Sequence, residues 1–472
     1  MIEVRCFGSL VEAAFLRDEV NALNRTGARP DPFSTFEFFE NFLRHEAGSS
    51  QGQGPRLWFL CAFDAGRLVG YMALKQATQR VLGLRASRLG FLVTHDGDRP
   101  QLVARPEHAL AVSEAFYACL LERRREWSFL ELRQQDAASP LFPPPAAVKL
   151  KGYWVRQWPS LDNATIQVRW DTLEAYFKSF SPKFRSNVSR QMRSFLAAGE
   201  VEYLASSDPA ATPALFELYH GIEPHSWKSR AGTVIGRYPG WVEYFKGLLD
   251  ARQPMRVSIH VLLLDGVPIA GLISGAFMKG LYALHMVYDD RLSRLAPGSA
   301  ALLMGMRQAI DGGYAFFNLL SGFGYYKVRW QAQMTETRVA QIYRVGTPFF
   351  WRRVFGDWKR RVLSARGGET PAFFNPLRRD VSEREGKQAR PGGVAGLQMS
   401  PGERERIAAL IAGVRKGQGE FLSAAQLAAA MPFETRRVAG DAAGGYPGTR
   451  ARDGSPAVPP CAQAGAVSGC RA

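Results

Sequence analysis

A basic loop between an apolar run and the start of a helix is the segment best suited to chemistry. Residues 281–288 predict a strand, and residues 299–311 predict a helix with Ser299 as its N-cap. The loop between them carries Arg291, Arg294 and Gly298. A helix N-terminus presents free backbone N–H groups and a partial positive charge, so this pattern favours an anion such as phosphate. Ordinary connections in α/β proteins can have the same composition, so the loop alone is a weak signal.

The elements that would position this loop occur twice in the same order. Apolar runs on either side of Asp64-Ala65-Gly66 and of Asp265-Gly266 predict two β-hairpins. After each hairpin the sequence predicts a strand (88–93; 281–288), a helix (107–122; 299–311) and a short strand (129–132; 315–319). The repeat predicts a duplicated mixed α+β fold, with two mixed sheets flanked by helices.

Length and composition allow two domains and a tail. The 472 residues are 46% hydrophobic and 22% charged, and no apolar run approaches the ~20 residues that span a bilayer. The five cysteines are scattered and form no Cys-x-x-Cys pair, which argues against a disulfide framework and against a zinc site. The first residues do not resemble a signal peptide. These features favour a cytoplasmic protein without a bound metal.

The charge is strongly basic, with 60 Lys and Arg against 43 Asp and Glu, a formal net charge of +17. Such a balance favours anionic partners, which include nucleic acid, anionic lipid and phosphorylated ligands. A solvated Arg-rich surface is the alternative explanation. No helix-turn-helix, zinc-finger or RNA-recognition signature is present, so specific nucleic-acid binding is not expected.

Five separated motifs between about 170 and 345 resemble one family. They are the basic segment 181–190, the Glu…Ser-Trp-Lys…Gly-Thr segment 223–233, an Asp-Gly turn with Pro-Ile-Ala-Gly at 265–271, Tyr-Asp-Asp to Ala-Pro-Gly-Ser at 288–299, and Gly-Gly-Tyr to Tyr-Tyr-Lys-Val-Arg-Trp at 312–330. In this order they resemble the GNAT acyltransferases associated with bacterial cellulose and exopolysaccharide synthesis. The resemblance extends more faintly to the tandem-GNAT plan of the Fem-type peptidoglycan aminoacyltransferases. It implies a tandem GNAT-like fold.

The resemblance also implies an acyl-coenzyme A donor and an amine acceptor. The pyrophosphate would lie on the loop from Arg291 to Ser299, and the pantetheine along strand 281–288, where a backbone N–H polarises the thioester. The predicted donor contacts are Met286, Tyr288, Arg291, Arg294, Pro297, Gly298 and Ser299. The family's usual loop has more glycine than this one, whose single glycine follows Pro297. This departure leaves the identity of the donor open.

Acyl transfer to an amine needs a proton acceptor for the ammonium and a proton donor for the departing thiolate. Glu223 is the first choice of base, and His225 is the alternative. Tyr326, or its neighbour Tyr325, is the candidate proton donor. Lys327 is the candidate contact to phosphate or to an anionic acceptor. Each has a structural alternative: a solvated carboxylate, a structural histidine, packed tyrosines or a surface lysine.

Acceptor contacts are expected from four further residues, which are Trp227, Lys228, Arg185 and Arg190. Residues 178–193 contain five basic residues and no acid, and their apolar positions share one helical face. A solvated basic helix face is the alternative for this segment. Trp227 can equally be a pocket wall or part of the core.

The expected organisation is a GNAT-like half at 1–160, a GNAT acyltransferase domain at 161–346, a basic aromatic extension at 347–384 and a largely disordered tail at 385–472. One helix is expected in the tail, around 404–414. In the extension, Trp351, Phe355, Trp358 and Val362 share a helical face. That face suits a membrane interface, and the alternative is that it docks onto the second half.

The motifs and the resemblance together predict an acyl-coenzyme A-dependent N-acyltransferase that acts on an amino sugar or an envelope or exopolysaccharide precursor. Its expected place is the cytoplasm, with peripheral contact at the inner membrane as an option. Two alternatives remain. One is a Fem-type aminoacyl-tRNA-dependent transferase, although the sequence has no long coiled-coil insertion. The other is a non-catalytic basic binding protein.

Overall fold

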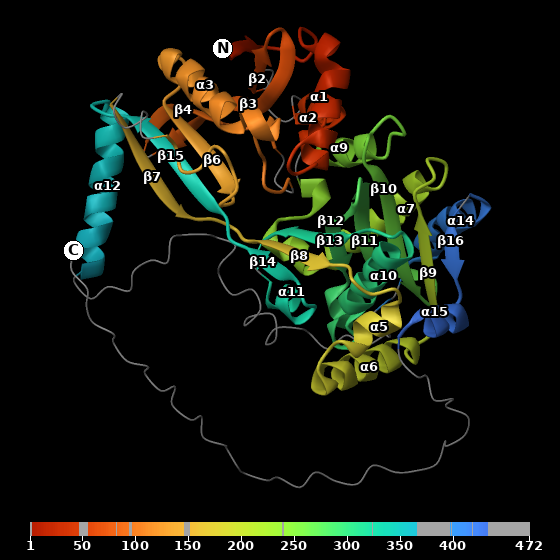
Figure 1. Ribbon diagram of the computed structural model, residues 1–472. Coiled ribbons are helices and arrows are strands. Elements are labelled where there is room, and N and C mark those ends of the chain that lie inside the picture. The colour runs from red at the N-terminus through yellow and green to blue at the C-terminus, as the bar shows by residue number, and fades with distance from the viewer. Residues whose placement is uncertain are drawn as a thin grey trace, which may run out of the picture. The chain divides into compact units, whose positions relative to one another are not determined.

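Two mixed sheets flanked by helices make up the described part of the chain (Figure 1). The computed structural model describes residues 2–46, 55–81, 83–93, 97–145, 152–237, 240–322, 324–365, 397, 399–417 and 419–432. The mixed α+β class expected from the sequence is confirmed. None of the helices in these ranges is long and apolar enough to cross a membrane.

The first sheet has the strand order β1-β2-β3-β4-β6-β15-β7, with β5 paired to β3. Its strands are β1 (Glu3–Phe7), β2 (Arg56–Asp64), β3 (Arg67–Val81), β4 (Leu84–Phe91), β5 (Val103–Ala104), β6 (Phe129–Gln135), β7 (Tyr153–Pro159) and β15 (Arg338–Arg344). The helices of this half are α1 (Arg17–Thr26), α2 (Phe36–Glu46) and α3 (Ala109–Glu122), with short 3-10 turns at Ala14–Leu16, Pro32–Ser34 and Pro106–His108.

The second sheet has the order β14-β8-β13-β12-β11-β10-β9-β16. Its strands are β8 (Asn163–Gln167), β9 (Val201–Ser206), β10 (Arg256–Leu264), β11 (Val267–Phe277), β12 (Gly280–Tyr288), β13 (Phe316–Ser321), β14 (Gln333–Thr335) and β16 (Glu420–Leu422). The helices of this half are α5 (Leu173–Lys178), α6 (Pro182–Leu196), α7 (Thr212–Ile222), α8 (Trp227–Ala231), α9 (Trp241–Leu248), α10 (Pro297–Asp311), α11 (Tyr325–Arg329), α14 (Pro401–Lys416) and α15 (Ala424–Ala430). Helix α12 (Pro348–Ala365) packs on the first sheet. Short 3-10 turns are η5 (Glu223–His225), η6 (Ile235–Arg237) and η7 (Asp290–Leu295).

The duplication expected from the sequence is present in the strand pairing. In each half a hairpin (β2–β3; β10–β11) is followed by an antiparallel strand, a crossover helix and a parallel strand. Both hairpin turns place two residues at positive φ, Ala65 and Gly66 in one and Asp265 and Gly266 in the other. A two-residue turn with this backbone matches the twist of the paired strands, which explains why the Asp-Gly signal worked.

Two boundaries differ from the expectation. Helix α10 begins at Pro297 rather than after Ser299, with Ala296 in the left-handed region as its N-cap. Strand β15 follows the second half in sequence, yet it pairs with β6 and β7 of the first sheet (Figure 1).

The tail is more ordered than expected. Helix α14 and helix α15 both begin with a capping box, at Ser400 and Ser423, and β16 adds to the second sheet beside β9. Buried Ile411, Val414 and Leu427 attach this segment to the domain. Helix α14 confirms the one helix expected around 404–414. The expectation of disorder is wrong for residues 419–432, because a capping box and apolar contacts fix β16 and α15. Residues 385–396 and 433–472 lie outside the described part.

The helix expected in the basic aromatic extension is present as α12, but it does not dock onto the second half as the alternative prediction had it. It packs on the first sheet, not the second half, and it does so through Phe349 and Phe350. Trp351, Phe355 and Trp358 are exposed. The face that carries them is therefore not the docked one.

The two halves share an apolar core and a buried polar junction. The ring of Phe33 meets that of Tyr282, and Phe38 meets Tyr244, so residues from both sheets form one cluster. Beside it, the carboxylate of Asp98 from the first half accepts hydrogen bonds from Asn163 Nδ2 (2.7 Å), Asn318 Nδ2 (3.0 Å) and Ser321 Oγ in the second sheet. Asp98 thus ties the first half to strand β13.

We expect Asp98→Ala to lower the free energy of unfolding by about 3 kcal/mol, because three buried donors lose their acceptor. Urea unfolding followed by circular dichroism measures the change. Replacing the exposed Asp171 by Ala is the control and should change stability little. An Asp98→Ala protein as stable as the control variant would show that the junction does not hold the halves together.

Candidate functional site

The parallel strands β12 and β13 part soon after they meet. They pair only at Gly280–Tyr282 and Phe316–Asn318. On the other side of β12 the register changes between Ile273 and Ser274 of β11, so Leu284 is an extra residue in β12. From Ala283 onward no strand in the described ranges pairs with the β13 side of β12. A strand side without a neighbouring strand is a position that an extended ligand can take.

The end of β13 is bent away by local backbone geometry. Leu320 has φ of 59°, and its N–H donates to Asn318 Oδ1 at 2.8 Å. The ammonium of Lys327 in α11 donates to the carbonyls of Leu319 (2.9 Å), Leu320 (3.1 Å) and Ser321 (3.4 Å). Side chains therefore satisfy backbone groups that a neighbouring strand would otherwise bind.

Lys327 is a buried cation that binds the carbonyls at the end of β13. Burial lowers its pKa to about 8, against the opposing effect of the Asp98 carboxylate. The sequence suggested a contact to phosphate or to an anionic acceptor. In the structure the ammonium faces the three β13 carbonyls, so Lys327 positions the opening between the strands.

The predicted phosphate loop forms the short helix η7. Buried Asp289 accepts a hydrogen bond from the backbone N–H of Arg291 (2.9 Å) and also binds its guanidinium, with Nε 3.0 Å from both carboxylate oxygens. This pairing raises the pKa of Arg291 and neutralises much of its charge. Arg294 is exposed. Of the two arginines, Arg294 is thus better placed to attract an anion.

Helix α10 starts with an open N-terminus. Pro297 is its first residue and has no N–H, and Ala296 supplies no side-chain cap, so the Gly298 N–H is the first that the helix presents to the loop. Gly298 lies against Tyr288, because a Cβ added there would be 2.9 Å from the tyrosine ring. Ser299 lies one residue further along and donates its N–H to the Ala296 carbonyl at 2.9 Å.

The strand contacts were expected from Met286 and Tyr288. Both are half-buried and pack against the cluster that includes α10. They therefore lie on the α10 face of β12, in the stretch of β12 that has no partner strand on its β13 side. The geometry brings the predicted donor residues to one region, between the open edge of β12 and the start of α10.

Glu223 is the centre of a second group, at the end of α7. Its carboxylate is buried and accepts from His220 Nδ1 (2.9 Å) and from the backbone N–H of Ile235 (2.9 and 3.1 Å to its two oxygens). Burial raises the pKa of Glu223, but these hydrogen bonds outweigh it and leave that pKa below its ordinary value. The same hydrogen bond raises the pKa of His220. Glu223 is thus held ionised, and His220 becomes the more basic partner.

His285 connects this group to β12, beside the extra residue Leu284. Its Nδ1 lies 2.6 Å from the Tyr219 hydroxyl and 3.8 Å from Glu223 Oε1. Its Nε2 is 3.4 Å from the Thr233 carbonyl oxygen. The Thr233 hydroxyl is buried and has no hydrogen-bond partner within the described ranges. The Thr233 hydroxyl can therefore donate or accept a hydrogen bond next to the Glu223 group.

Sequence reasoning missed His220, His285, Tyr219 and Thr233. The His220-x-x-Glu223 spacing at a helix end was a readable signal, since residues three apart share a helix face. His285 had no such signal, because it approaches Glu223 only through the sheet. His225, the predicted alternative base, is exposed, and its charge acts on Glu403 of α14 rather than on Glu223.

The other predicted residues lie around these two groups. Trp227 and Lys228 begin α8, and Lys228 lies over the Trp227 ring; α8 meets the phosphate loop through the ion pair of Arg230 with Asp290. Tyr326 is 43% exposed, yet its phenol end lies among protein atoms, and that burial raises its pKa to about 12. The side chain of Tyr325 lies outside the described part.

The basic helix α6 has the apolar face expected from the sequence, with Val188, Met192 and Phe195 buried. Arg185 donates to the carbonyls of Lys178 (2.9 Å) and Phe180 (2.7 Å), which caps the end of α5. Arg190 is exposed and bonds Asn187. Of the two predicted acceptor contacts on this helix, only Arg190 has an exposed side chain that is not engaged with backbone.

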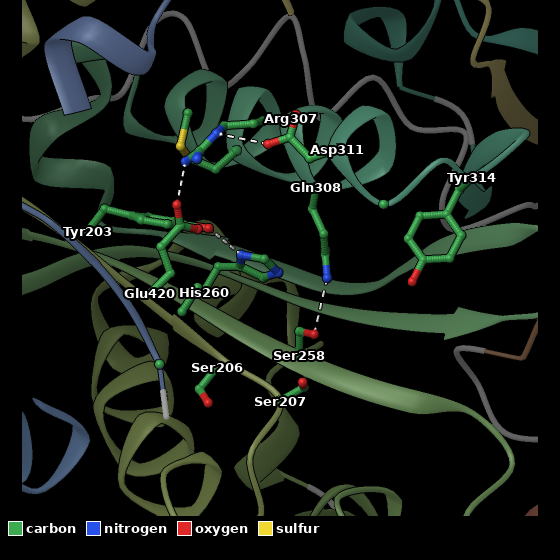
Figure 2. Close-up of a pocket in the computed structure, with 14 residues that line it drawn as sticks. Tyr203, Ser206, Ser207, Ser258, His260, Arg307, Gln308, Asp311, Tyr314 and Glu420 are labelled. Carbon is green, nitrogen blue, oxygen red and sulfur yellow. Dashed lines mark hydrogen bonds and ion pairs between the residues drawn. The ribbon is translucent and has the colours of Figure 1, made fainter. Parts of the chain in front are cut away.

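A hollow of about 440 Å³ lies at the other end of α10, away from its N-terminus (Figure 2). Its buried groups bind one another: His260 accepts from or donates to Tyr203 (2.7 Å) and Ser274 (2.9 Å), and Gln308 binds Ser258 (3.1 Å). Burial lowers the pKa of His260 to about 4. This network fastens α10 to the sheet. In the described ranges no group of three or more metal-ligating side chains is placed to hold a metal.

Comparison with known proteins identifies the class of the second half. Residues 182–328 match a family model described as an acetyltransferase (GNAT) domain. The matched segment, which lies within the second sheet and its helices, is thus similar to an acetyltransferase (GNAT) domain, and this similarity supports an acyltransferase activity. Domains of this family use an acyl-coenzyme A as co-substrate.

Several solved structures are similar at low identity. FemX matches at 11% identity with a TM-score of 0.45, over 71% of this chain and 97% of that chain. A tandem GNAT protein from the clavulanic acid biosynthesis pathway matches at 12% identity with a TM-score of 0.42, over 74% and 99%. The C-terminal domain of a putative lysylphosphatidylglycerol synthetase from Agrobacterium fabrum matches at 12% with a TM-score of 0.43, over 72% and 93%. No protein with a curated description matches the chain.

Removing the Lys327 ammonium tests its role at the strand end. We expect Lys327→Met to lower the free energy of unfolding by about 2 kcal/mol, because the β13 carbonyls lose a charged donor. It should also weaken acyl-coenzyme A binding, because the opening beside β12 loses its support. Urea unfolding and calorimetry measure the two effects. The exposed Lys246, changed to Met, is the matched control; equal behaviour of both variants would contradict the assignment.

The coupling of Glu223 to His220 can be tested by titration. In Glu223→Gln we expect the His220 pKa to fall, because the hydrogen-bonded carboxylate that raises it is gone. In the folded protein the Glu223 pKa is lowered and the His220 pKa is raised. The stabilising pair of charged Glu223 and His220 is therefore lost as pH falls through the Glu223 pKa, and also as pH rises through the His220 pKa. Histidine NMR signals measure the titration.

The matched control for this titration is Glu217→Gln, since Glu217 also raises the pKa of His220 but more weakly. Its effect should be the smaller of the two. A His220 pKa that does not respond to Glu223→Gln would mean that the two side chains are uncoupled in solution.

Proposed function

We propose that the protein is an acyl-coenzyme A-dependent N-acyltransferase whose acceptor is an amine on an amino sugar or on another envelope or exopolysaccharide precursor. The observation that carries the donor assignment is the open edge of β12 opposite the bent end of β13, within the segment that matches an acetyltransferase domain. The acceptor class rests on the motif resemblance between residues 170 and 345. The reaction would take place in the cytoplasm, where acyl-coenzyme A is found.

The donor would lie between β12 and the start of α10. Its pyrophosphate would accept hydrogen bonds from the open N-terminus of α10, with Arg294 adding charge. Its pantetheine would run along β12 from Ala283, where no strand in the described ranges pairs with the β13 side of β12. A backbone N–H of this edge would bind the thioester oxygen as negative charge develops on it.

The Glu223 group would manage the proton of the acceptor. His220, whose pKa is raised by ionised Glu223, would take the proton from the ammonium, so that the neutral amine attacks the thioester carbon. The C–N bond forms, the C–S bond breaks, and the departing thiolate takes a proton from the Tyr326 phenol. The attacking nitrogen loses its second proton as the amide forms, and that proton returns through solvent to the Tyr326 phenolate. The unpartnered Thr233 hydroxyl would bind the acceptor beside this pair. Glu223 thus acts through His220 instead of touching the amine.

The test separates donor binding from turnover. We expect Arg294→Ala to weaken the Kd for acyl-coenzyme A about tenfold, the loss of one charge-assisted phosphate contact. Exposed Arg67, on the β2–β3 turn, is the control when changed to Ala. Glu223→Gln should leave the Kd nearly unchanged while turnover falls about 100-fold or more.

The measurements are calorimetry with a series of acyl-coenzyme A thioesters, and release of free thiol in the presence of amino sugars and other amines. If the Arg294 and Arg67 variants bind acyl-coenzyme A equally well, the pyrophosphate does not bind at this loop. Full turnover in Glu223→Gln would place the base elsewhere. An absence of thiol release with every acceptor, despite donor binding, would refute the acceptor class.

A further inference from the structure

Helix α12 holds a row of large aromatic side chains in water. Trp351, Phe355 and Trp358 are 50, 63 and 62% exposed. Their spacing of four and three residues puts them on one face of the helix, and Val362 continues the row in the sequence. Scattered exposed apolar residues are common, but a continuous row of this size marks a contact surface.

The opposite face of the same helix is already committed. Phe349 stacks on Phe129 at 5.5 Å between ring centres, and Phe350 meets Trp154 at 5.5 Å. About two turns further, Asp357 pairs with Arg156 of β7 (2.7 Å). At about 100° per residue these docked positions lie opposite the aromatic row. Docking on the first sheet therefore fixes the row in an outward orientation.

Positive charge lies along one edge of the aromatic row. Helix α12 contains Arg352, Arg353, Lys359, Arg360 and Arg361, and its one acidic residue, Asp357, is paired on the docked face. Exposed Arg352 and Lys359 lie about 100° and 80° from Trp351 around the helix, along one edge of the row. The guanidinium of Arg352 also lies beside Gly83, at the tip of the β3–β4 hairpin, whose Arg80 and Arg85 are exposed.

We propose that this surface binds an anionic phospholipid bilayer, with α12 lying in the plane of the interface. Tryptophan and phenylalanine are favoured at the level of the lipid headgroups, and arginine and lysine bind the anionic ones. A second copy of the chain fits less well, because it would bring two equally basic faces together. This inference does not depend on the proposed reaction, and the two fail separately.

The test uses the full chain and vesicles of phosphatidylcholine, with or without one third phosphatidylglycerol. We expect flotation with the anionic vesicles at low salt and much less at high salt. A triple variant, Trp351→Ala, Phe355→Ala and Trp358→Ala, should reduce the bound fraction about tenfold or more, because its apolar contact with the bilayer is lost. Arg352→Gln with Lys359→Gln should weaken binding and flatten its salt dependence.

The control is a double variant at other exposed apolar positions, Phe15→Ala with Leu110→Ala, which should bind like the original protein. Thermal unfolding checks that the triple variant stays folded, as expected for exposed side chains. No binding to anionic vesicles at low salt overturns the proposal. So does a dimer, seen by light scattering without lipid, that the triple variant loses, because the row would then be an interface between copies.

Discussion

The bent end of β13 is the constraint on which the candidate site depends. Two parallel strands can part only if the backbone groups that leave their ladder find other partners. Here the Lys327 ammonium takes the carbonyls, the Asn318 amide takes the Leu320 N–H, and Asp98 holds Asn318 and Ser321. The unpaired edge of β12 follows directly from this arrangement. Two charged side chains, Lys327 and Asp98, thus shape the region through separate hydrogen bonds to the end of β13.

The first half contributes to the second through support. Asp98, which completes the bent end of β13, comes from the first half, and so does part of the apolar core behind β12, where Phe33 meets Tyr282. The residues assigned to donor and proton chemistry all lie in the second half. The second half therefore needs the first half for the geometry of its strands, whether or not the first half catalyses a reaction of its own.

Local signals were predictable from the sequence, and long-range ones were not. The hairpins at Asp64-Ala65-Gly66 and Asp265-Gly266 and the apolar face of α6 depend on neighbouring residues, so pattern and turn chemistry were sufficient. The pairing of Arg291 with Asp289, two residues away, was also within reach. The approach of His285 to Glu223 and of Asp98 to Asn318 was not, because each depends on how the sheets and the two halves pack. The order of β16 and α15 in the tail was underestimated because the composition hid the capping box at Ser423.

The position of β15 has a consequence for synthesis of the chain on the ribosome. Strands β6 and β7 leave the ribosome long before β15, which must enter between them to complete the first sheet. Until then both strands present an unpaired edge, and the first half cannot close by itself. The high sequence separation of these pairs slows folding and prolongs the exposure of those edges. A fragment that stops before residue 338 would keep them exposed permanently, so the two halves cannot be separated by cutting the chain between them.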